Sequence, residues 1–309
     1  MDKIICIVGP TASGKTRLSV EMAKALRGEI LSCDSMQLYR GMDIGTAKPT
    51  EEEKQGIVHH MMDFLDPQED YSVSRYVQQA DACLQDILAR DKTAVIVGGT
   101  GLYVDSLIAG REFAPFPQTG RREELTVLAA EQGIDVVWQK LCEVDPESAE
   151  RIHPANEKRV IRALEIYLET GKTMTEHDRE SRSRLPKYQP LWIGLDYENR
   201  ADLYARIDLR VEEMFRQGLE EEVRRLLDRG IPAAATALQA IGYKELVAYL
   251  RGEGSLKEAM EQIQLASRRY AKRQLTWFRR NEKIHWLTLP GDPDFEEVFR
   301  QAMSLVSQE

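Results

Sequence analysis

The sequence predicts an α/β protein in which a mostly parallel sheet is flanked by helices and a small all-helical domain is inserted into that core. Three observations lead to this fold class. A glycine-rich loop near the N-terminus stands between an apolar run and a helical pattern. Later apolar runs are continuous, as in strands that are buried on both faces. The stretch from about 113 to 190 is helical in period and has no convincing strand.

The first predicted strand, at 4–8, leads directly into Gly9-Pro10-Thr11-Ala12-Ser13-Gly14-Lys15-Thr16. This octapeptide fits G-x-x-x-x-G-K-[ST], the P-loop pattern, and a helix is expected after it at 17–26. Backbone N–H groups of such a loop, together with the helix N-terminus, favour a polyphosphate. Lys15 is expected to bind the outer phosphates, and the Thr16 hydroxyl is placed to hold Mg²⁺.

Two further strands end near possible functional residues. A short strand at 29–32 ends just before Asp34, and a clearer one at 93–97 ends at the glycine-rich turn 98–101, which a helix follows. Ligands of parallel sheets bind beyond the carboxyl ends of the strands. We therefore expect the phosphate loop, Asp34 and Thr100 to lie close together.

The character of the sequence changes near residue 113. The segment 114–117 has the composition of a linker, and the residues after it are helical in period. One helix is expected to open at Asp145, and another to run from 156 to 170 with Gly171 as its cap. These features predict a helical insertion domain at 113–190.

Strands return after the insertion, at 191–195 and 284–289, and complete the core. The predicted α/β core, with a P-loop-type phosphate site, therefore comprises 1–112 and 191–309. A length of 309 residues suits one or two domains and a substantial buried interior.

Composition indicates a soluble protein of the cytoplasm. Hydrophobic residues make up 42% of the chain and charged residues 30%, no apolar run approaches a membrane span, and the short N-terminal apolar run is unlike a signal peptide. Four cysteines without C-x-x-C spacing indicate neither a zinc site nor a disulfide framework, so we expect buried, reduced thiols. A monomer is the simplest expectation.

The net charge of −9 argues against broad, nonspecific binding of nucleic acid through overall charge, but it permits a local basic groove. Two basic clusters are present. One, at 268–280, interleaves cations with aromatic residues, and the other, at 158–162, lies on a predicted helix of the insertion. Either alone is equally well explained as a solvated face. Two clusters in an acidic chain favour a polyanionic partner.

The strand at 93–97 lacks the terminal aspartate that holds Mg²⁺ in many ATP-hydrolysing or kinase P-loop proteins. Asp34 is then the best carboxylate near the phosphates. The glycine-rich turn alone is equally well explained by tight packing. Together with Asp34-Ser35-Met36-Gln37, it indicates a pocket for a polar acceptor, with Asp34 as proton acceptor and Thr100 as an orienting hydroxyl.

Other polar residues are less informative. Arg206 and Arg210 lie four apart on a helical segment at 201–222, and spacing alone favours surface roles for both. For Arg206 we expect an exposed face or an ion pair with Asp202 or Glu213. His59-His60 has no third residue spaced to complete a metal site, and adjacent residues on a helix point in different directions, so structural or polar contacts are favoured.

A set of motifs, taken together and in order, resembles the tRNA dimethylallyltransferase family, the bacterial tRNA isopentenyltransferases. The motifs are Gly9 to Thr16, Asp34-Ser35-Met36-Gln37-Leu38-Tyr39-Arg40, Gly45-Thr46-Ala47-Lys48-Pro49, His59-His60, Gly98-Gly99-Thr100-Gly101-Leu102-Tyr103, Arg151-Ile152-His153-Pro154, Ile241-Gly242-Tyr243 and Lys272-Arg273-Gln274-Leu275-Thr276-Trp277. The resemblance implies transfer of a dimethylallyl group from dimethylallyl diphosphate to N6 of the adenosine 3′-adjacent to the anticodon of tRNA. Such families are often labelled ATP-binding from the loop motif.

The resemblance also implies roles for individual residues. Asp34 would be the general base and Thr100 would assist it, while Lys15 and Arg210 would act on the leaving diphosphate. The diphosphate site would comprise Gly9, Pro10, Thr11, Ala12, Ser13, Gly14, Lys15, Thr16 and Arg210. The tRNA anticodon stem-loop would contact Asp34, Ser35, Met36, Gln37, Thr100, Arg122, Lys158, Arg159, Val160, Ile161 and Arg162. Mg²⁺ is the expected cofactor, and no zinc is expected.

Two other functions are consistent with part of the sequence. An ATP-dependent P-loop kinase of a small molecule would explain the loop, with the insertion as a lid, but it leaves the basic clusters unexplained. A noncatalytic RNA-binding module would explain the clusters but not the phosphate loop.

Overall fold

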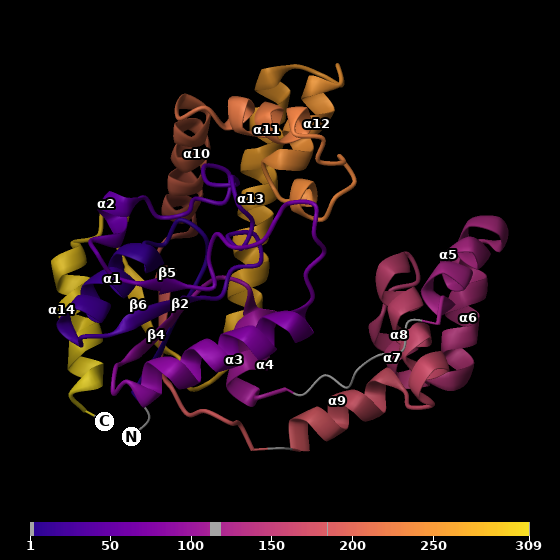
Figure 1. The fold of residues 1–309 in the computed structure, drawn as a ribbon, viewed down its shortest axis with the longest axis horizontal. Coiled ribbons are helices and arrows are strands. Elements are labelled where there is room, and N and C mark those ends of the chain that lie inside the picture. The colour runs from indigo at the N-terminus through magenta and orange to yellow at the C-terminus, as the bar shows by residue number, and fades with distance from the viewer. Residues whose placement is uncertain (1–2, 112–118, 184, 309) are drawn as a thin grey trace. The chain divides into compact units, whose positions relative to one another are not determined.

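The computed structural model describes residues 3–111, 119–183 and 185–308. All strands among these residues form one parallel sheet, in the order β3-β2-β4-β1-β5-β6 (Figure 1). The strands are β1 (Ile4–Val8), β2 (Glu29–Ser32), β3 (His59–His60), β4 (Ala94–Val97), β5 (Leu191–Tyr197) and β6 (His285–Leu289). The predicted fold class is confirmed.

Alternation along β1 explains how the sheet is covered on both faces. Ile4, Cys6 and Val8 pack in one buried cluster with α3 (Val73–Ala89) and α4 (Gly101–Ala109). Ile5 and Ile7 point to the opposite face, where they pack with α1 (Lys15–Ala25) and α14 (Phe295–Val306). Each fully buried Ile or Val side chain stabilises the fold by about 1.5–3 kcal/mol, which is why the central strands are continuous apolar runs.

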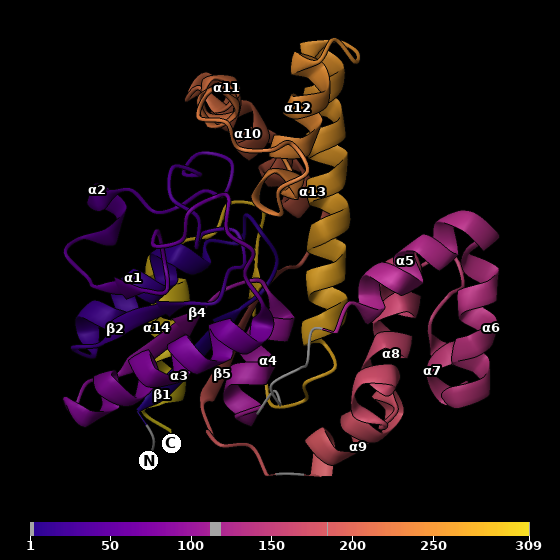
Figure 2. The ribbon, with the colours of Figure 1, turned by 45° about the vertical axis from the view of Figure 1, so that its right-hand side comes forward.

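The remaining core helices gather on the side of the sheet where the phosphate loop lies (Figures 1 and 2). They are α2 (Glu51–Lys54), α10 (Arg200–Arg216), α11 (Leu219–Asp228), the 3₁₀ turn Ala237–Gln239, α12 (Tyr243–Leu250) and α13 (Leu256–Phe278). The segment expected to be one helix at 201–222 is two helices, because Gly218 adopts φ 97° between α10 and α11. The long helix α13 begins at a capping box, in which Ser255 and Glu258 exchange side-chain and backbone hydrogen bonds.

The insertion forms a compact unit of its own. Its residues are Arg111–Lys187, whereas Met1–Gly110 and Tyr188–Glu309 form the other unit, so the expected boundaries at 113 and 190 differ from these by only a few residues. The insertion helices are α5 (Arg121–Gln132), α6 (Ile134–Val144), α7 (Pro146–Arg151), α8 (Glu157–Thr170) and α9 (Met174–Ser183). They pack around their own apolar cluster. The linker expected at 114–117 lies outside the described residues.

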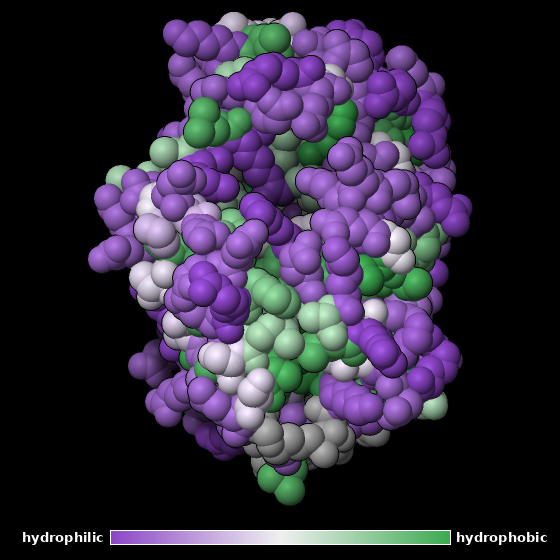
Figure 3. Space-filling model, turned by 90° about the vertical axis from the view of Figure 1, so that its left-hand side faces the viewer, coloured by the Kyte–Doolittle hydropathy of each residue, from purple (hydrophilic) through white to green (hydrophobic). Residues whose placement is uncertain are grey.

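Surface properties fit part of the expectation from composition. No helix among the described residues is long and apolar enough to cross a membrane. The face of the molecule in Figure 3 is largely polar, with apolar residues gathered mainly in its lower half. All four cysteines are free thiols, but only Cys6 and Cys33 are buried, while Cys83 and Cys142 are partly exposed.

Candidate active site

The phosphate loop joins β1 to α1, and its conformation is fixed by hydrogen bonds to its own carbonyl groups. The Ser13 hydroxyl and the Lys15 ammonium both donate to the carbonyl oxygen of Pro10, at 2.8 and 2.6 Å. Arg210, from α10, donates to Thr11 Oγ1 at 3.1 Å. Two cations from distant parts of the chain therefore meet at one loop.

Electrostatics around the loop favour an anion. Burial, and after it the Arg210 cation, lower the pKa of Lys15 to about 7, whereas Asp34 opposes the shift. Burial also lowers the pKa of Arg210, while Asp34 and Glu53 oppose this. Two poorly solvated cations side by side are costly unless an anion binds between them. The loop and its two cations therefore suit a phosphate group.

Asp34 lies at the carboxyl end of β2 and is held by the turn that follows. Its Oδ1 accepts hydrogen bonds from the backbone N–H groups of Met36 and Gln37, at 2.9 and 3.3 Å. Thr100, at the end of β4, accepts from the N–H of Ser35 at 3.1 Å and donates to the Ser35 hydroxyl at 3.4 Å. The ends of β2 and β4 therefore meet, and no described residue hydrogen-bonds the second oxygen of Asp34.

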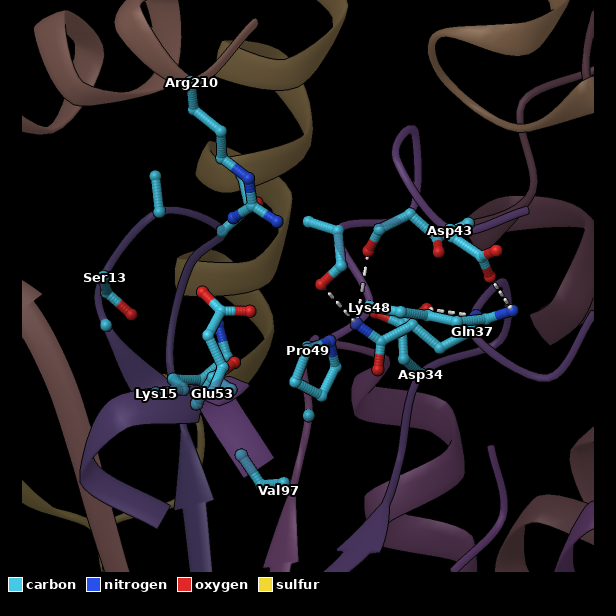
Figure 4. Close-up of a pocket in the computed structure, with 18 of the residues that line it drawn as sticks. Ser13, Lys15, Asp34, Gln37, Asp43, Lys48, Pro49, Glu53, Val97 and Arg210 are labelled. Atoms are coloured by element: carbon cyan, nitrogen blue, oxygen red, sulfur yellow. Dashed lines mark hydrogen bonds and ion pairs between the residues drawn. The ribbon is translucent and has the colours of Figure 1, made fainter. Parts of the chain in front are cut away.

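Two adjoining cavities share the wall on which Asp34 lies. The first, of about 370 Å³, contains the phosphate loop, and the second, of about 360 Å³, is lined by both apolar and polar side chains, many of them from α10, α13 and the segment before α12. The residues that line both are Thr11, Asp34, Thr46, Arg210, Met214 and Tyr270. Figure 4 shows Arg210 reaching into the first cavity from above, with Lys15 and Asp34 on opposite sides. Thr100 is absent from the described lining residues and acts on the wall through Ser35.

The loop 43–49 covers the first cavity and is anchored by a buried carboxylate. Glu222, from α11, accepts hydrogen bonds from the N–H groups of Asp43, Ile44 and Gly45 at 2.9, 2.9 and 3.1 Å. The Tyr243 hydroxyl donates to the same carboxylate at 2.6 Å. The Gly-Thr-Ala-Lys-Pro and Ile-Gly-Tyr motifs thus build one structure. Glu222 was missed from sequence because it stands in an acidic run typical of an exposed helix.

Lys48 stabilises the same loop from within. Its ammonium group lies between the carboxylates of Asp43 and Asp63, at 2.7 and 2.6 Å, and its side chain is only 6% exposed. Gln37 donates to the carbonyl oxygens of Thr46 and Ala47, at 3.2 and 3.1 Å. Gln37 therefore ties the Asp34 turn to the loop and also lines the first cavity.

The predicted tRNA contacts of the insertion fall into two kinds. Lys158 and Arg159 are exposed in the first turn of α8, and neither has an ion-pair partner among the described residues. Arg122 and Arg162 both pair with Glu165, at 3.0 and 2.9 Å. The side chains of Val160 and Ile161 are buried in the core of the insertion, so these two positions anchor α8 rather than face a ligand.

In the second basic cluster, at 268–280, two arginines pair with acidic side chains of the core. Arg268 contacts both oxygens of Asp208 at 2.7 and 2.6 Å, and Arg279 pairs with Asp196 at 2.7 Å. Arg206, for which an exposed face or an ion pair was expected, is partly buried and lies over the ring of Tyr197 at 6.0 Å. The polyanionic partner expected from this cluster therefore does not account for Arg268 and Arg279, whose charges are paired within the protein.

The histidine pair lies on β3, a two-residue strand rather than a helix. His60 Nε2 contacts Glu29 at 2.7 Å, and His59 Nδ1 contacts the carbonyl oxygen of Ile57 at 2.9 Å. The polar-contact role expected for these residues is confirmed. Among the described residues there is no cluster of three or more His, Cys, Asp or Glu side chains that could hold a metal.

Magnesium does not require such a cluster, because it commonly keeps several waters and binds one or two protein oxygens together with substrate phosphates. Thr16 and Glu53 supply hard oxygen donors to the first cavity, beside the phosphate loop. The residues present therefore fit a magnesium–phosphate complex, but not a metal held by protein alone. The fold and the site define a P-loop α/β protein with a cationic loop suited to an anion and a second cavity beside it.

Comparison with known proteins identifies the family. The model of the IPP transferase family matches residues 37–281. The tRNA dimethylallyltransferases of Caldanaerobacter subterraneus and Geobacillus thermodenitrificans are 48% and 50% identical, over 96% and 97% of this chain and 95% and 96% of theirs. The chain therefore belongs to the tRNA dimethylallyltransferase family of tRNA-modifying prenyltransferases.

Solved structures agree with this family. The tRNA isopentenylpyrophosphate transferase of Bacillus halodurans is 41% identical with a TM-score of 0.75, covering 100% of this chain and 96% of that one. A eukaryotic dimethylallyltransferase acting on tRNA is 28% identical with a TM-score of 0.82, covering 99% of this chain and 80% of that one.

Proposed function

We propose that the protein transfers a dimethylallyl group from dimethylallyl diphosphate to N6 of the adenosine 3′-adjacent to the anticodon in tRNA, releasing diphosphate. The observation that carries the proposal is the position of Asp34. It lies on the wall shared by the phosphate-loop cavity and the second cavity, so one carboxylate lines both. A transfer reaction needs its proton acceptor at such a junction.

The phosphate-side residues suit the breaking bond. When the allylic C–O bond breaks, its electron pair leaves with the diphosphate, and the negative charge on that group grows. Lys15, Arg210 and the loop N–H groups would stabilise this charge. The allylic carbon, now electron-poor, accepts the electron pair of the adenine N6.

Asp34 suits the bond that forms. As N6 attacks the allylic carbon, its excess proton passes to the Asp34 carboxylate, which leaves a neutral prenylated adenosine. General-base catalysis of this kind typically contributes about 10²–10⁴-fold to the rate. Thr100 would hold the Asp34 turn in place through Ser35. The adenine must leave its stack to reach such a site, which costs least in a single-stranded loop.

Magnesium, when bound beside Thr16, would neutralise diphosphate oxygens and assist departure of the leaving group.

We also propose that the insertion binds the anticodon stem-loop. Lys158 and Arg159 stand in the first turn of α8, where the helix dipole disfavours cations, so helix stability does not explain them. Binding of a polyanion explains the presence of these two cations.

We further propose that the protein is a monomer and acts in the cytoplasm.

The test is direct. The protein is incubated with unmodified tRNA, dimethylallyl diphosphate and Mg²⁺, and the digested tRNA is analysed by mass spectrometry for prenylated adenosine. We expect product with the wild type and much slower formation with Asp34→Asn. Absence of product, or ATP-dependent phosphorylation of a small molecule that tRNA does not affect, would contradict the proposal.

A further inference from the structure

Gln274 is a buried polar side chain that contacts two sides of the site. It lies on α13 and is only 5% exposed. Its Oε1 accepts a hydrogen bond from the backbone N–H of Thr11 at 2.8 Å, and its Nε2 donates to the carbonyl oxygen of Gly99 at 3.0 Å. Thr11 follows β1 and Gly99 follows β4. A single amide group therefore connects the phosphate loop to the turn that carries Thr100.

Packing shows that α13 lies directly on this turn. A Cβ atom on Gly99 would stand 2.0 Å from Gln274 Nε2, and one on Gly101 would stand 2.2 Å from Trp277 Cδ1. Trp277 also donates a hydrogen bond to Asp105 of α4 at 2.8 Å. A side chain at either glycine would therefore displace Gln274 or Trp277 from its present position. Tight packing and a functional turn are the same feature here.

Tyr270 lies near Gln274 on α13. It lies one turn before Gln274 and lines both cavities. Burial, together with the nearby Asp34 charge, raises its pKa to about 12, while Thr100 and Gln274 oppose this shift. The hydrogen bonds of Gln274 connect Thr11 to Gly99, and the adjacent Thr100 bonds Ser35, the residue next to Asp34.

We propose that Gln274 is a positioning residue that sets the spacing between the phosphate loop and the Asp34–Thr100 side of the site. The proposal rests on the proposed function, since this spacing aligns the allylic donor with the adenine acceptor. Gln274 acts through its hydrogen bonds to Thr11 and Gly99. A misplacement of about 1 Å in a reacting geometry costs about 10²-fold in rate, so even a small relaxation of the two loops would be measurable.

The chemistry of the amide gives a specific test. Gln274 needs one acceptor for Thr11 and one donor for Gly99. Methionine has a similar length but cannot replace this pair of hydrogen bonds, whereas an ionised glutamate has acceptors only and repels the Gly99 carbonyl oxygen. A protonated glutamate restores one acceptor and one O–H donor. Activity of Gln274→Glu should therefore recover as the pH falls, and the burial of the introduced carboxyl group should raise its pKa into the measurable range.

The experiment compares full-length wild type, Gln274→Met and Gln274→Glu with Gln262→Met, the same substitution at an exposed position of α13. Four quantities are measured: kcat for prenyl transfer with both substrates saturating, Kd for inorganic pyrophosphate, Kd for tRNA, and Tm. We expect Gln274→Met to lower kcat by about 10²-fold with both Kd values close to those of the wild type. Gln262→Met should match the wild type throughout.

The ratio of Gln274→Glu activity to wild-type activity should rise as the pH falls, a change that a purely structural role would not produce. The proposal is overturned if folded Gln274→Met keeps the wild-type kcat, or if its whole loss appears in the Kd for pyrophosphate. If Gln274→Met does not fold, a pH-independent ratio for Gln274→Glu overturns it. Absence of transfer by the wild type would refute the proposed function itself, and the positioning proposal with it.

Discussion

The basic runs on α8 and α13 look alike in sequence, but their cations have different partners in the structure. On α8, Lys158 and Arg159 project from the first turn without ion-pair partners among the described residues. On α13, Arg268 is paired with Asp208, and the residues between the cations, Tyr270 and Gln274, face the site. The comparison shows that the role of a run of charged residues depends on which residues from other parts of the chain contact it. In our proposal α8 serves binding, whereas α13 serves chemistry.

The largest expected effect concerns the site that α13 supports. Asp34→Asn removes the proton acceptor but keeps the size of the side chain, so kcat should fall by about 10²–10⁴-fold while the Kd for tRNA changes little. Single-turnover kinetics and tRNA-binding titrations measure the two quantities. If Asp34→Asn lost kcat and tRNA affinity by equal factors, Asp34 could not be assigned to the chemical step rather than to tRNA binding.

A smaller effect is expected at α8. The double variant Lys158→Ala/Arg159→Ala should weaken tRNA binding on the order of tenfold and reduce the slope of log K against log salt by about 2, because two phosphate contacts are lost. The control is Arg224→Ala/Lys257→Ala, which removes the same charge from α11 and α13 residues that pair with Glu220 and Glu261. An unchanged slope in the α8 variant would refute its role in binding.

The phosphate site gives a pH-dependent prediction. Burial lowers the pKa of Lys15 to about 7 in the free protein, and a bound diphosphate should raise it again. Above pH 7, binding of pyrophosphate must therefore be accompanied by protonation of Lys15, so the contribution of Lys15 to pyrophosphate affinity falls as the pH rises. Below pH 7, Lys15 is already charged before the ligand binds. Calorimetry of pyrophosphate binding at pH 8, in buffers of different ionisation enthalpy, should show uptake of about one proton more for the wild type than for Lys15→Arg.

Equal proton uptake by the two proteins would mean that Lys15 is already charged in the free site. The arginine variant is the suitable reference because its side chain remains protonated throughout this range.

The smallest effect is expected at Arg268. Its pair with Asp208 is about one-third exposed on each side, so Arg268→Ala should lower the free energy of unfolding by only about 1 kcal/mol and leave the salt dependence of tRNA binding unchanged. Arg269→Ala, at an exposed position next to it, is the control and should change stability less. Chemical denaturation checks both. A smaller slope of log K for tRNA binding against log salt in Arg268→Ala would show that Arg268 contacts tRNA.

Local sequence patterns predicted much of the fold of this protein and the position of its phosphate loop. The phosphate loop, the helix after it and the buried strands are encoded in short contiguous stretches, and the convergence of Asp34 with the loop follows from a general property of parallel sheets. The strand β3 was missed because two residues carry no periodicity. The burial of Val160 and Ile161 could have been inferred from the apolar stripe of α8, which packs on α5 and α6.

The contacts that complete the site could not be predicted from local sequence. Gln274 is 263 residues from Thr11, and Glu222 is 179 residues from Asp43. Neither residue differs in type from its exposed neighbours on the same helix. Only the packing of α11 and α13 against the loops shows which carboxylate and which amide are buried.

The most direct test of the division between α13 and α8 is a single-turnover measurement with both substrates saturating. The wild type, Asp34→Asn and Lys158→Ala/Arg159→Ala are compared for the rate at which prenylated adenosine appears in tRNA. We predict a rate reduced by about 10²–10⁴-fold for Asp34→Asn, and the wild-type rate for the α8 variant once tRNA is saturating. A normal rate for Asp34→Asn, or a slow rate for the saturated α8 variant, would contradict this.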